Sequence, residues 1–283
     1  AVMVKKMFNR KLVLLSTRHG YEEKYFNNYP DNKGKIVYNN YYFISRYVLG
    51  RMDAHLAVSK AMSDLYYDLK LTRERAAYVH HGIEPVELPR HYAGAGYRKA
   101  EQQLVVVGRI ETVKGHRYLF EAMPAVIKEF PGVTVLILGN GTEKANLERK
   151  AEELGITRHI EFLGFQPEPH AYIAHSDIII QPSLYESFGL VFIESFSLKT
   201  MMIAFDVPAG NEIVTHNENG ILVPPFNTAL LASAIIQMLK QPAERERIAE
   251  NAYRSYLSGF TAEKMVDGTK AWYDSLDKVK ALG

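Results

Sequence analysis

The chain of 283 residues contains no cysteine. It therefore forms no disulfide, no thiolate zinc site and no cysteine nucleophile, a composition that fits a reducing cytoplasm. An excess of charge of one sign is also missing, because 34 Lys and Arg stand against 32 Asp and Glu, a formal net charge of +2. A balance this close to neutral argues against broad binding to nucleic acid. Any anion that binds is expected to be small and held locally.

Long apolar runs are absent as well. No stretch of the sequence approaches the roughly 20 apolar residues that a membrane-spanning helix needs. Residues 1–8 carry lysines within a short apolar segment and have no small-residue cleavage site, so no signal peptide is expected. We expect a cytoplasmic protein in which any membrane contact is peripheral and on the inner face. The chain begins with Ala1 rather than Met, which suggests a fragment or a processed chain.

From residue 103 onward, short apolar runs alternate with amphipathic stretches. The apolar runs predict buried strands at residues 103–107, 133–138, 160–163, 177–181, 201–205 and 220–223. Helical spacing between them predicts helices at 118–130, 144–154 and 190–197. Strands that alternate with helices over short loops predict a parallel sheet covered on both faces, which is a Rossmann-like domain.

The first part of the chain holds fewer units of the same α/β kind. We expect strands at 11–16, 54–58 and 76–79, and helices at 41–52 and 60–70. Residues 84–100 contain two prolines and two glycines without apolar periodicity, which is typical of an interdomain linker. A long final helix is expected at 261–282, with Met265, Trp272, Leu276 and Val279 on its buried face.

These elements divide the sequence into three parts. Residues 1–88 are expected to form a partial N-terminal α/β domain on the acceptor side, and residues 89–258 a Rossmann-like domain that binds a nucleotide sugar. Residues 259–283 are expected to form a helix that packs back toward the N-terminal domain.

The loop from Gly108 to Gly115 follows the first strand of the regular domain and carries Arg109 and Lys114 between its two glycines. Arginine supplies a planar fork of donors and lysine a point charge, a combination that suits a diphosphate. Open α/β sheets bind their ligands at the carboxyl ends of the strands, which is where this loop lies. Two cations alone also fit a solvated basic loop.

A second element, from Glu186 to Glu194, follows the strand predicted at 177–181. Gly189 opens a helix here, and the free N–H groups of a helix N-terminus form a site for phosphate. Glu186 lies before this helix and Glu194 lies inside it. Glu186 could also be an acid that interacts with the helix dipole, and Glu194 could be a surface residue. The neighbours of Glu194 are apolar, however, and an acid in such a helix needs a partner.

Taken in order, these elements resemble the family-four retaining glycosyltransferases of the GT-B fold, also called glycosyl transferases group 1. Glu186 and Glu194, with seven residues between them, match the family's pair of glutamates, and Arg109 and Lys114 match its diphosphate-binding pair. Supporting segments are residues 79–84, 139–141, 162–164 and 220–224. The resemblance runs through most of the chain. A complete member starts with more strands and a Gly-rich loop, so the first domain is expected to be incomplete.

The resemblance implies a role for each motif. Arg109 and Lys114 would neutralise the leaving nucleoside diphosphate, while Glu186 would hold hydroxyls of the donor sugar. His19, after the strand predicted at 11–16, would contact the sugar near the reacting carbon and completes the catalytic set. Glu194 would hold the ribose. The remaining nucleotide contacts are expected from Gly108, Gly164, Phe165 (through its backbone, to the base), Phe188, Gly189, Leu190 and Val191.

No metal and no cofactor are expected, because the sequence has no Asp-x-Asp pair. The charge on the diphosphate would be met by Arg109, Lys114 and the helix dipole. The histidines His80, His81 and His170 are assigned structural roles, since no spacing among them resembles a metal site.

By analogy with the family, the expected activity is hexosyl transfer from a UDP- or GDP-sugar to a glycan or lipid-linked acceptor, in polysaccharide biosynthesis. Two alternatives stay open: a nucleotide-sugar epimerase of the same fold, and a truncated module that binds nucleotide without transferring a sugar.

Overall fold

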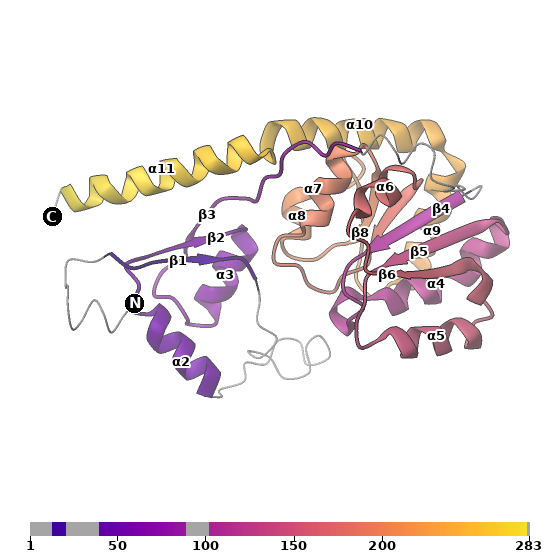
Figure 1. Cartoon of the computed structure of the whole chain (residues 1–283), viewed down its shortest axis with the longest axis horizontal. Coiled ribbons are helices and arrows are strands. Elements are labelled where there is room, and N and C mark those ends of the chain that lie inside the picture. The colour runs from indigo at the N-terminus through magenta and orange to yellow at the C-terminus, as the bar shows by residue number, and fades with distance from the viewer. Residues whose placement is uncertain (1–12, 21–39, 89–101, 282–283) are drawn as a thin grey trace. The chain divides into compact units, whose positions relative to one another are not determined.

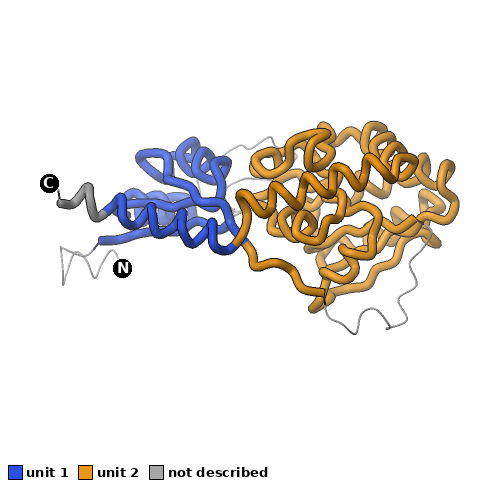
Figure 2. Tube along the Cα trace, turned by 90° about the horizontal axis from the view of Figure 1, so that it is seen from above, with its two compact units in different colours: residues 1–82, 262–283 blue, residues 83–261 orange. Residues whose placement is uncertain are grey.

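The computed structural model describes residues 13–20, 40–88 and 102–281. The chain divides into two compact units, one made of residues 1–82 and 262–283 and the other of residues 83–261 (Figure 2). These divisions fall a few residues from the boundaries expected at 88 and 258. Most of the linker predicted at 84–100 lies outside the described residues.

The larger unit is built on a sheet of six parallel strands in the order β6-β5-β4-β7-β8-β9 (Figure 1). The strands are β4 (Gln102–Val107), β5 (Val133–Leu138), β6 (Ile160–Gly164), β7 (Ile178–Gln181), β8 (Met201–Phe205) and β9 (Ile221–Val223). The chain moves outward in one direction from β4 to β6 and in the other from β7 to β9. The order therefore reverses between β4 and β7, and open α/β sheets bind ligands at the carboxyl ends of strands beside such a point.

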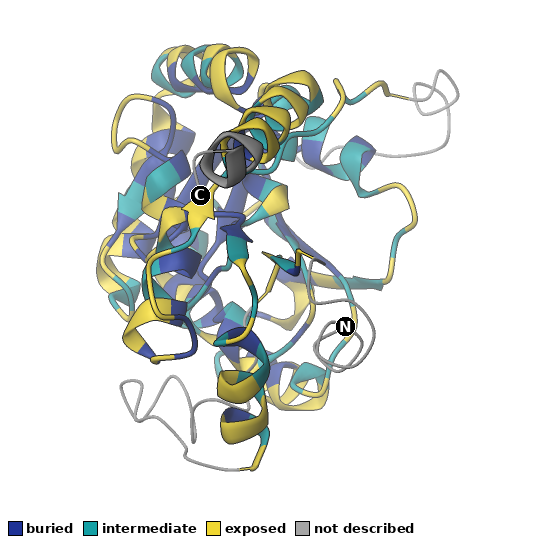
Figure 3. Ribbon diagram, turned by 90° about the vertical axis from the view of Figure 1, so that its left-hand side faces the viewer, coloured by how far each residue is buried: buried dark blue, intermediate teal, exposed yellow. Residues whose placement is uncertain are grey.

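Helices cover both faces of this sheet, as the predicted parallel fold requires (Figure 1). The principal helices are α4 (His116–Glu129), α5 (Lys144–Glu153), α6 (Pro169–Ala174), α7 (Leu190–Ser197), α9 (Thr228–Lys240) and α10 (Pro242–Gly259). Two short elements, η3 (Thr112–Lys114) and α8 (Gly210–Ile213), lie in loops after strands. β7 and β8 are buried at every residue, which is possible only when both faces of the sheet are covered (Figure 3).

The helices α9 and α10 correct the sequence analysis, which assigned no element to residues 224–260. The side chain of Asn227 caps α9 by accepting a hydrogen bond from the Leu230 N–H at 3.0 Å. Pro242 occupies the first turn of α10, where its missing N–H costs nothing. Both start signals are present in the sequence. α9 packs against α4, and α10 packs against α7.

The smaller unit contains a three-stranded parallel sheet in the order β1-β2-β3, with β1 (Leu15–Arg18), β2 (Ala54–Ala57) and β3 (Ala77–Tyr78). Its helices are α2 (Asn40–Leu49), α3 (Lys60–Asp68) and α11 (Ala262–Ala281). β1 lies later than the strand predicted at 11–16, of which residues 11 and 12 are not described. On α11, Trp272 is buried as predicted, while Met265 and Leu276 are only partly buried and the side chain of Val279 lies outside the described ones.

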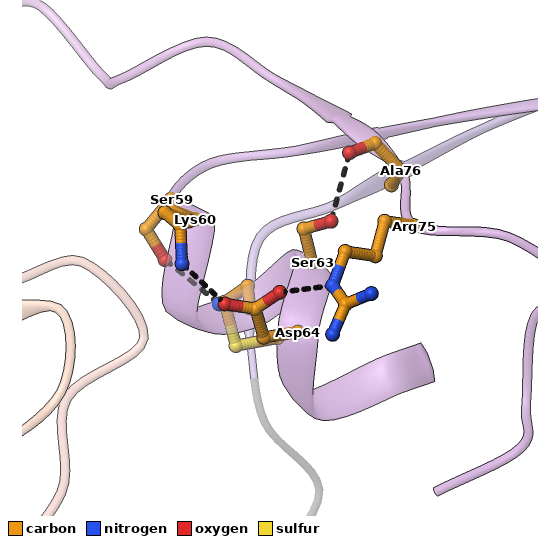
Figure 4. A network of polar contacts seen from close by, with 7 residues as sticks. Ser59, Lys60, Ser63, Asp64, Arg75 and Ala76 are labelled. Carbon is orange, nitrogen blue, oxygen red and sulfur yellow. Dashed lines mark hydrogen bonds and ion pairs between the residues drawn. The ribbon is translucent and has the colours of Figure 1, made fainter. Parts of the chain in front are cut away.

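A polar network joins α3 to the segment before β3 (Figure 4). Asp64 accepts hydrogen bonds from Lys60 Nζ and from Arg75 Nε, both at 2.7 Å, and Ser63 Oγ donates to the Ala76 carbonyl at 2.7 Å. The hydrogen bonds from Lys60 and Arg75 hold the pKa of Asp64 below its ordinary value. Because the Lys60 and Arg75 side chains are largely exposed, the ion pairs orient the segment more than they stabilise it.

Candidate functional site

The carboxyl ends of β4, β5 and β6 surround a pocket of about 480 Å³. Arg109 follows β4, Asn140 follows β5, and Phe165 and Gln166 follow β6, and all four line it. Phe165 is 74% exposed. The predicted residues Gly108, Arg109, Gly164 and Phe165 therefore gather at one edge of the sheet.

The loops that form this pocket are tied together by their backbones. The Gly139 N–H donates to the Gly164 carbonyl at 2.7 Å, and the Gly108 N–H donates to the Leu138 carbonyl at 2.9 Å. A Cβ atom at Gly139 would lie 1.9 Å from the Gly108 carbonyl oxygen, so a side chain there would push two loops apart. This close approach gives the turn predicted at 139–141 its role in shaping the pocket.

Lys114 and Glu186 form an ion pair, although they come from loops that are 72 residues apart in the sequence. Lys114 Nζ lies 2.7 Å from Glu186 Oε1, and the Glu186 residue is only 9% exposed. The loops meet because the Leu184 N–H donates to the Val113 carbonyl at 2.8 Å. The structure thus joins the two predicted motifs through one partly buried carboxylate and one cation.

The helix N-terminus of α7 faces no internal acceptor. Among the described residues, none accepts a hydrogen bond from the N–H groups of Gly189, Leu190 or Val191. Gly189 has a φ of +96°, and a Cβ there would lie 2.3 Å from the Phe192 ring. The three N–H groups are therefore available to an anion, and the phosphate site expected here stays a prediction.

Phe188 can offer a ligand only its backbone. Its side chain is 2% exposed, and its ring packs 6.2 Å, centroid to centroid, from the ring of Phe260. A contact between Phe188 and the nucleotide stays a prediction, and it would have to involve the backbone and not the aromatic ring.

Glu194, on α7, lies beside His170, on α6. His170 Nε2 is 3.8 Å from Glu194 Oε1, and the two side chains are 33% and 21% exposed. The sequence analysis assigned His170 a structural role, and the structure places it next to a predicted ligand-binding acid. Glu194, the acid that was expected to need a partner in its apolar helix, therefore has a histidine next to it.

His19 belongs to the smaller unit. Its ring stacks on that of His81, with centroids 5.3 Å apart and an interplanar angle of 16°, and its Nδ1 lies 3.4 Å from His81 Nε2. Burial and the neighbouring His19 lower the pKa of His81. The expected contact of His19 with the donor sugar stays a prediction.

His116, the first residue of α4, is a buried imidazole close to the cation of the site. It is 2% exposed, and neither ring nitrogen has a hydrogen-bond partner among the described residues. Burial, and to a smaller extent the charge of Lys114, lower its pKa from 6.5 to about 4. The ring is therefore neutral in the folded protein at neutral pH.

The low pKa of His116 predicts a loss of stability in mild acid. Between pH 6.5 and about 4 the unfolded chain holds the proton and the folded one does not, so the stabilisation is complete above 6.5 and is lost as the pH falls. The full loss is about 3 kcal/mol. Urea denaturation across this window should show a shallower pH dependence in His116→Leu than in the wild type. Equal slopes would contradict the prediction.

The pocket residues that were not among the predicted site residues include Asn140, Gln166 and Pro169. The Gln166 side-chain amide is held in place, because its Nε2 donates to the Leu163 carbonyl at 2.8 Å. All three follow the carboxyl end of a predicted strand, and this position in a parallel sheet is the signal that could have found them.

Within residues 13–20, 40–88 and 102–281, no three His, Asp or Glu side chains are arranged to hold a metal ion. No helix there is both long and apolar enough to cross a bilayer.

Parts of the chain are similar in sequence to known proteins. The alpha-D-kanosaminyltransferase of Streptomyces kanamyceticus is 31% identical over 151 residues, which are 53% of this chain and 39% of that protein. The chain spans about half the length of the curated relatives it matches.

Solved structures show the same fold. The sucrose-phosphate synthase of Thermosynechococcus elongatus has a TM-score of 0.81 at 23% identity, over 98% of this chain and 70% of that structure. HepE of Anabaena, in complex with UDP and glucose, has a TM-score of 0.76 at 19% identity, over 98% of this chain and 74% of that structure. These likenesses confirm the predicted GT-B fold class. The family model described as glycosyl transferases group 1 matches residues 93–255, and the chain belongs to this family.

Proposed function

We propose that this chain supplies the donor-binding half of a retaining hexosyltransferase that acts without a metal ion. The observation that carries the proposal is the Lys114–Glu186 ion pair at 2.7 Å, formed where the order of the strands reverses. In this proposal Lys114 is the cation that meets the leaving diphosphate, and Glu186 is the carboxylate that accepts hydrogen bonds from the sugar hydroxyls. The neighbouring N-terminus of α7 supplies N–H donors.

The proposed reaction breaks the bond between the anomeric carbon and the diphosphate oxygen. Arg109, Lys114 and the N–H groups at the start of α7 stabilise the negative charge that develops on that oxygen. The leaving phosphate takes the proton of the acceptor hydroxyl, whose oxygen bonds to the anomeric carbon on the face the phosphate leaves. Glu186 accepts hydrogen bonds from the sugar and forms no covalent bond with it, and His19 contacts the sugar near the reacting carbon.

The ion pair also bears on how the donor would bind. Lys114 and Glu186 neutralise each other's charge, which lowers the cost of keeping a carboxylate that is only 9% exposed. A diphosphate is a second partner for Lys114, and sugar hydroxyls are new donors for Glu186. Binding of the complete donor therefore replaces one internal contact by two contacts with the same ligand.

The donor is proposed to be a UDP- or GDP-linked hexose. Its base would enter the pocket lined by Phe165 and Gln166, where the exposed ring of Phe165 offers apolar surface and its backbone offers hydrogen bonds. The complex of Anabaena HepE with UDP and glucose supports this choice of ligand class.

The acceptor is proposed to be a glycan or a lipid-linked sugar reached by peripheral contact with a membrane. On α2, Phe43, Ile44 and Tyr47 are 54%, 63% and 53% exposed, and the segment Asn40–Leu49 contains no acidic residue. Exposed Arg46 lies on the same helix, and Arg51 stacks on the Tyr47 ring at 3.4 Å. Aromatic and basic side chains on one short helix suit an anionic lipid surface. We expect the chain to float with anionic vesicles and the Phe43→Ser variant to float less. Equal flotation of the two would contradict this contact.

The donor site is tested by thermal denaturation with UDP, GDP, ADP, their sugar conjugates and NAD, each with and without EDTA. A ligand present at about 100 times its dissociation constant adds roughly 2.7 kcal/mol to the stability. We expect stabilisation by UDP or GDP and their sugars, with no effect of EDTA. Stabilisation by NAD alone, or by no nucleotide, would refute the proposal, and dependence on a divalent cation would refute metal independence.

A further inference from the structure

His170 has a ring nitrogen whose hydrogen-bonding capacity is unused. Its Nε2 is shielded from solvent and has no hydrogen-bond partner among the described residues. The carboxylate of Glu194 is nearby, with 3.8 Å between His170 Nε2 and Glu194 Oε1, which is beyond hydrogen-bond distance. Both residues belong to the same compact unit, on helices α6 and α7, which pack against each other.

An unpaired buried polar atom is unfavourable, and native structures retain few of them. The carboxylate is a strong acceptor for an imidazole N–H, and a movement of about 1 Å would bring the pair to normal hydrogen-bond length. Contacts of this kind are often long in empty sites and shorten when the ligand binds. The unpaired nitrogen and its distance from Glu194 therefore suggest a hydrogen bond that closes in the complex.

We propose that His170 is a positioning residue for Glu194. With a ribonucleotide bound, the His170 Nε2–H donates to Glu194 Oε1 and holds the carboxylate in the orientation in which it accepts hydrogen bonds from the ribose hydroxyls. This inference rests on the proposed function, because it takes Glu194 as the ribose-binding residue. The atom that acts on Glu194, His170 Nε2, lies beneath the surface, so its role is to orient the carboxylate and not to bind the ribose itself.

The arrangement gives the site a preference for ribose. A glutamate side chain is flexible, and ordering it on binding lowers the affinity. A neighbouring donor that orders the carboxylate strengthens its bonds to the two ribose hydroxyls. It has no effect on a nucleotide that lacks both hydroxyls. The role of His170 should therefore appear in the difference between the affinities for a ribonucleotide and for the same nucleotide without these hydroxyls.

The experiment measures dissociation constants by calorimetry for UDP and 2′,3′-dideoxy-UDP, and for GDP and its dideoxy form, and uses the base that binds more tightly. In the wild type the ribonucleotide should bind roughly 10- to 100-fold more tightly than its dideoxy form, as expected for hydrogen bonds to a charged group. His170→Phe keeps an aromatic ring but removes the donor. It should lower this ratio by roughly 3- to 10-fold while the dideoxy affinity stays unchanged. His170→Gln, which presents an amide N–H, should restore most of the ratio.

The outcomes separate this inference from the proposed function. Equal weakening of both nucleotides in His170→Phe would mean a structural role and would overturn the inference, and so would an unchanged ratio. Glu194→Ala should bring the ratio close to one. If it does not, the ribose role of Glu194 fails first, and the inference falls with it.

A measurement on the wild-type chain tests the same inference without depending on whether a variant folds. Long-range ¹H–¹⁵N spectra of the histidine rings should show His170 as the Nε2–H tautomer when the nucleotide is bound. The Nδ1–H tautomer in the complex would overturn the inference, because Nε2 would then have no proton to donate.

Discussion

Replacing Glu186 by glutamine is expected to slow sugar transfer by roughly 100- to 1,000-fold, the range found when a preorganised polar group is removed from a transition state. Glutamine keeps the size of the side chain but loses the charge that faces Lys114 at 2.7 Å and would hold the donor sugar. Lys114→Ala is expected to cause a loss of the same order, because it removes the cation from the leaving diphosphate. Release of nucleoside diphosphate from the sugar donor measures both losses.

The two substitutions should differ in their effect on stability. Lys114→Ala leaves the Glu186 carboxylate, which is only 9% exposed, without its partner, and this is destabilising. Glu186→Gln instead replaces that buried carboxylate by a neutral amide, so no buried negative charge is left unpaired. Because both residues act on one ligand, the double variant should be little slower than the slower single variant.

A matched control is Lys144→Ala, which breaks an exposed pair with Glu148 at 3.7 Å and should change neither rate nor stability. Full activity in Glu186→Gln or in Lys114→Ala would contradict the roles assigned to them. Strictly multiplicative losses in the double variant would show that the two side chains act independently.

Gly115→Ala is the substitution for which we expect the largest loss of folding free energy. Gly115 has a φ of +67°, and a Cβ there would lie 1.9 Å from the Pro182 carbonyl oxygen. The left-handed backbone and the overpacking together should cost roughly 2–5 kcal/mol. The affinity for nucleotide should fall as well, because Gly115 is the point at which the loop of Lys114 lies against the loop of Glu186.

Urea denaturation compares Gly115→Ala with Gly259→Ala. Gly259 is an exposed residue with no heavy atom within 4 Å of a built Cβ, and its substitution should change stability by no more than about 0.5 kcal/mol. If the two variants were equally stable, the close approach of the two loops would not be what holds the site together.

The strands of the larger unit could be predicted because each is a short apolar run bounded by a turn. Burial on both faces of a parallel sheet produces that pattern directly. β5 spans the predicted range of 133–138, and β7 begins one residue after the predicted start at 177. The helices α9 and α10 were missed, although Asn227 and Pro242 mark their beginnings and the buried residues Leu231, Ile235 and Met238 of α9 recur at helical spacing.

The amino-acid sequence was enough to predict at which edge of the sheet the charged residues of the two motifs lie. Parallel strands bring their carboxyl ends together whatever their order, so Arg109, Lys114 and Glu186 had to lie on one side. Which side chains touch depended on tertiary contacts between distant segments. The backbone approach at Gly115 brings Lys114 to Glu186, and the packing of α6 on α7 brings His170 to Glu194. Motif spacing contains no information on such distances, because the order of the strands and the packing of the helices determine them.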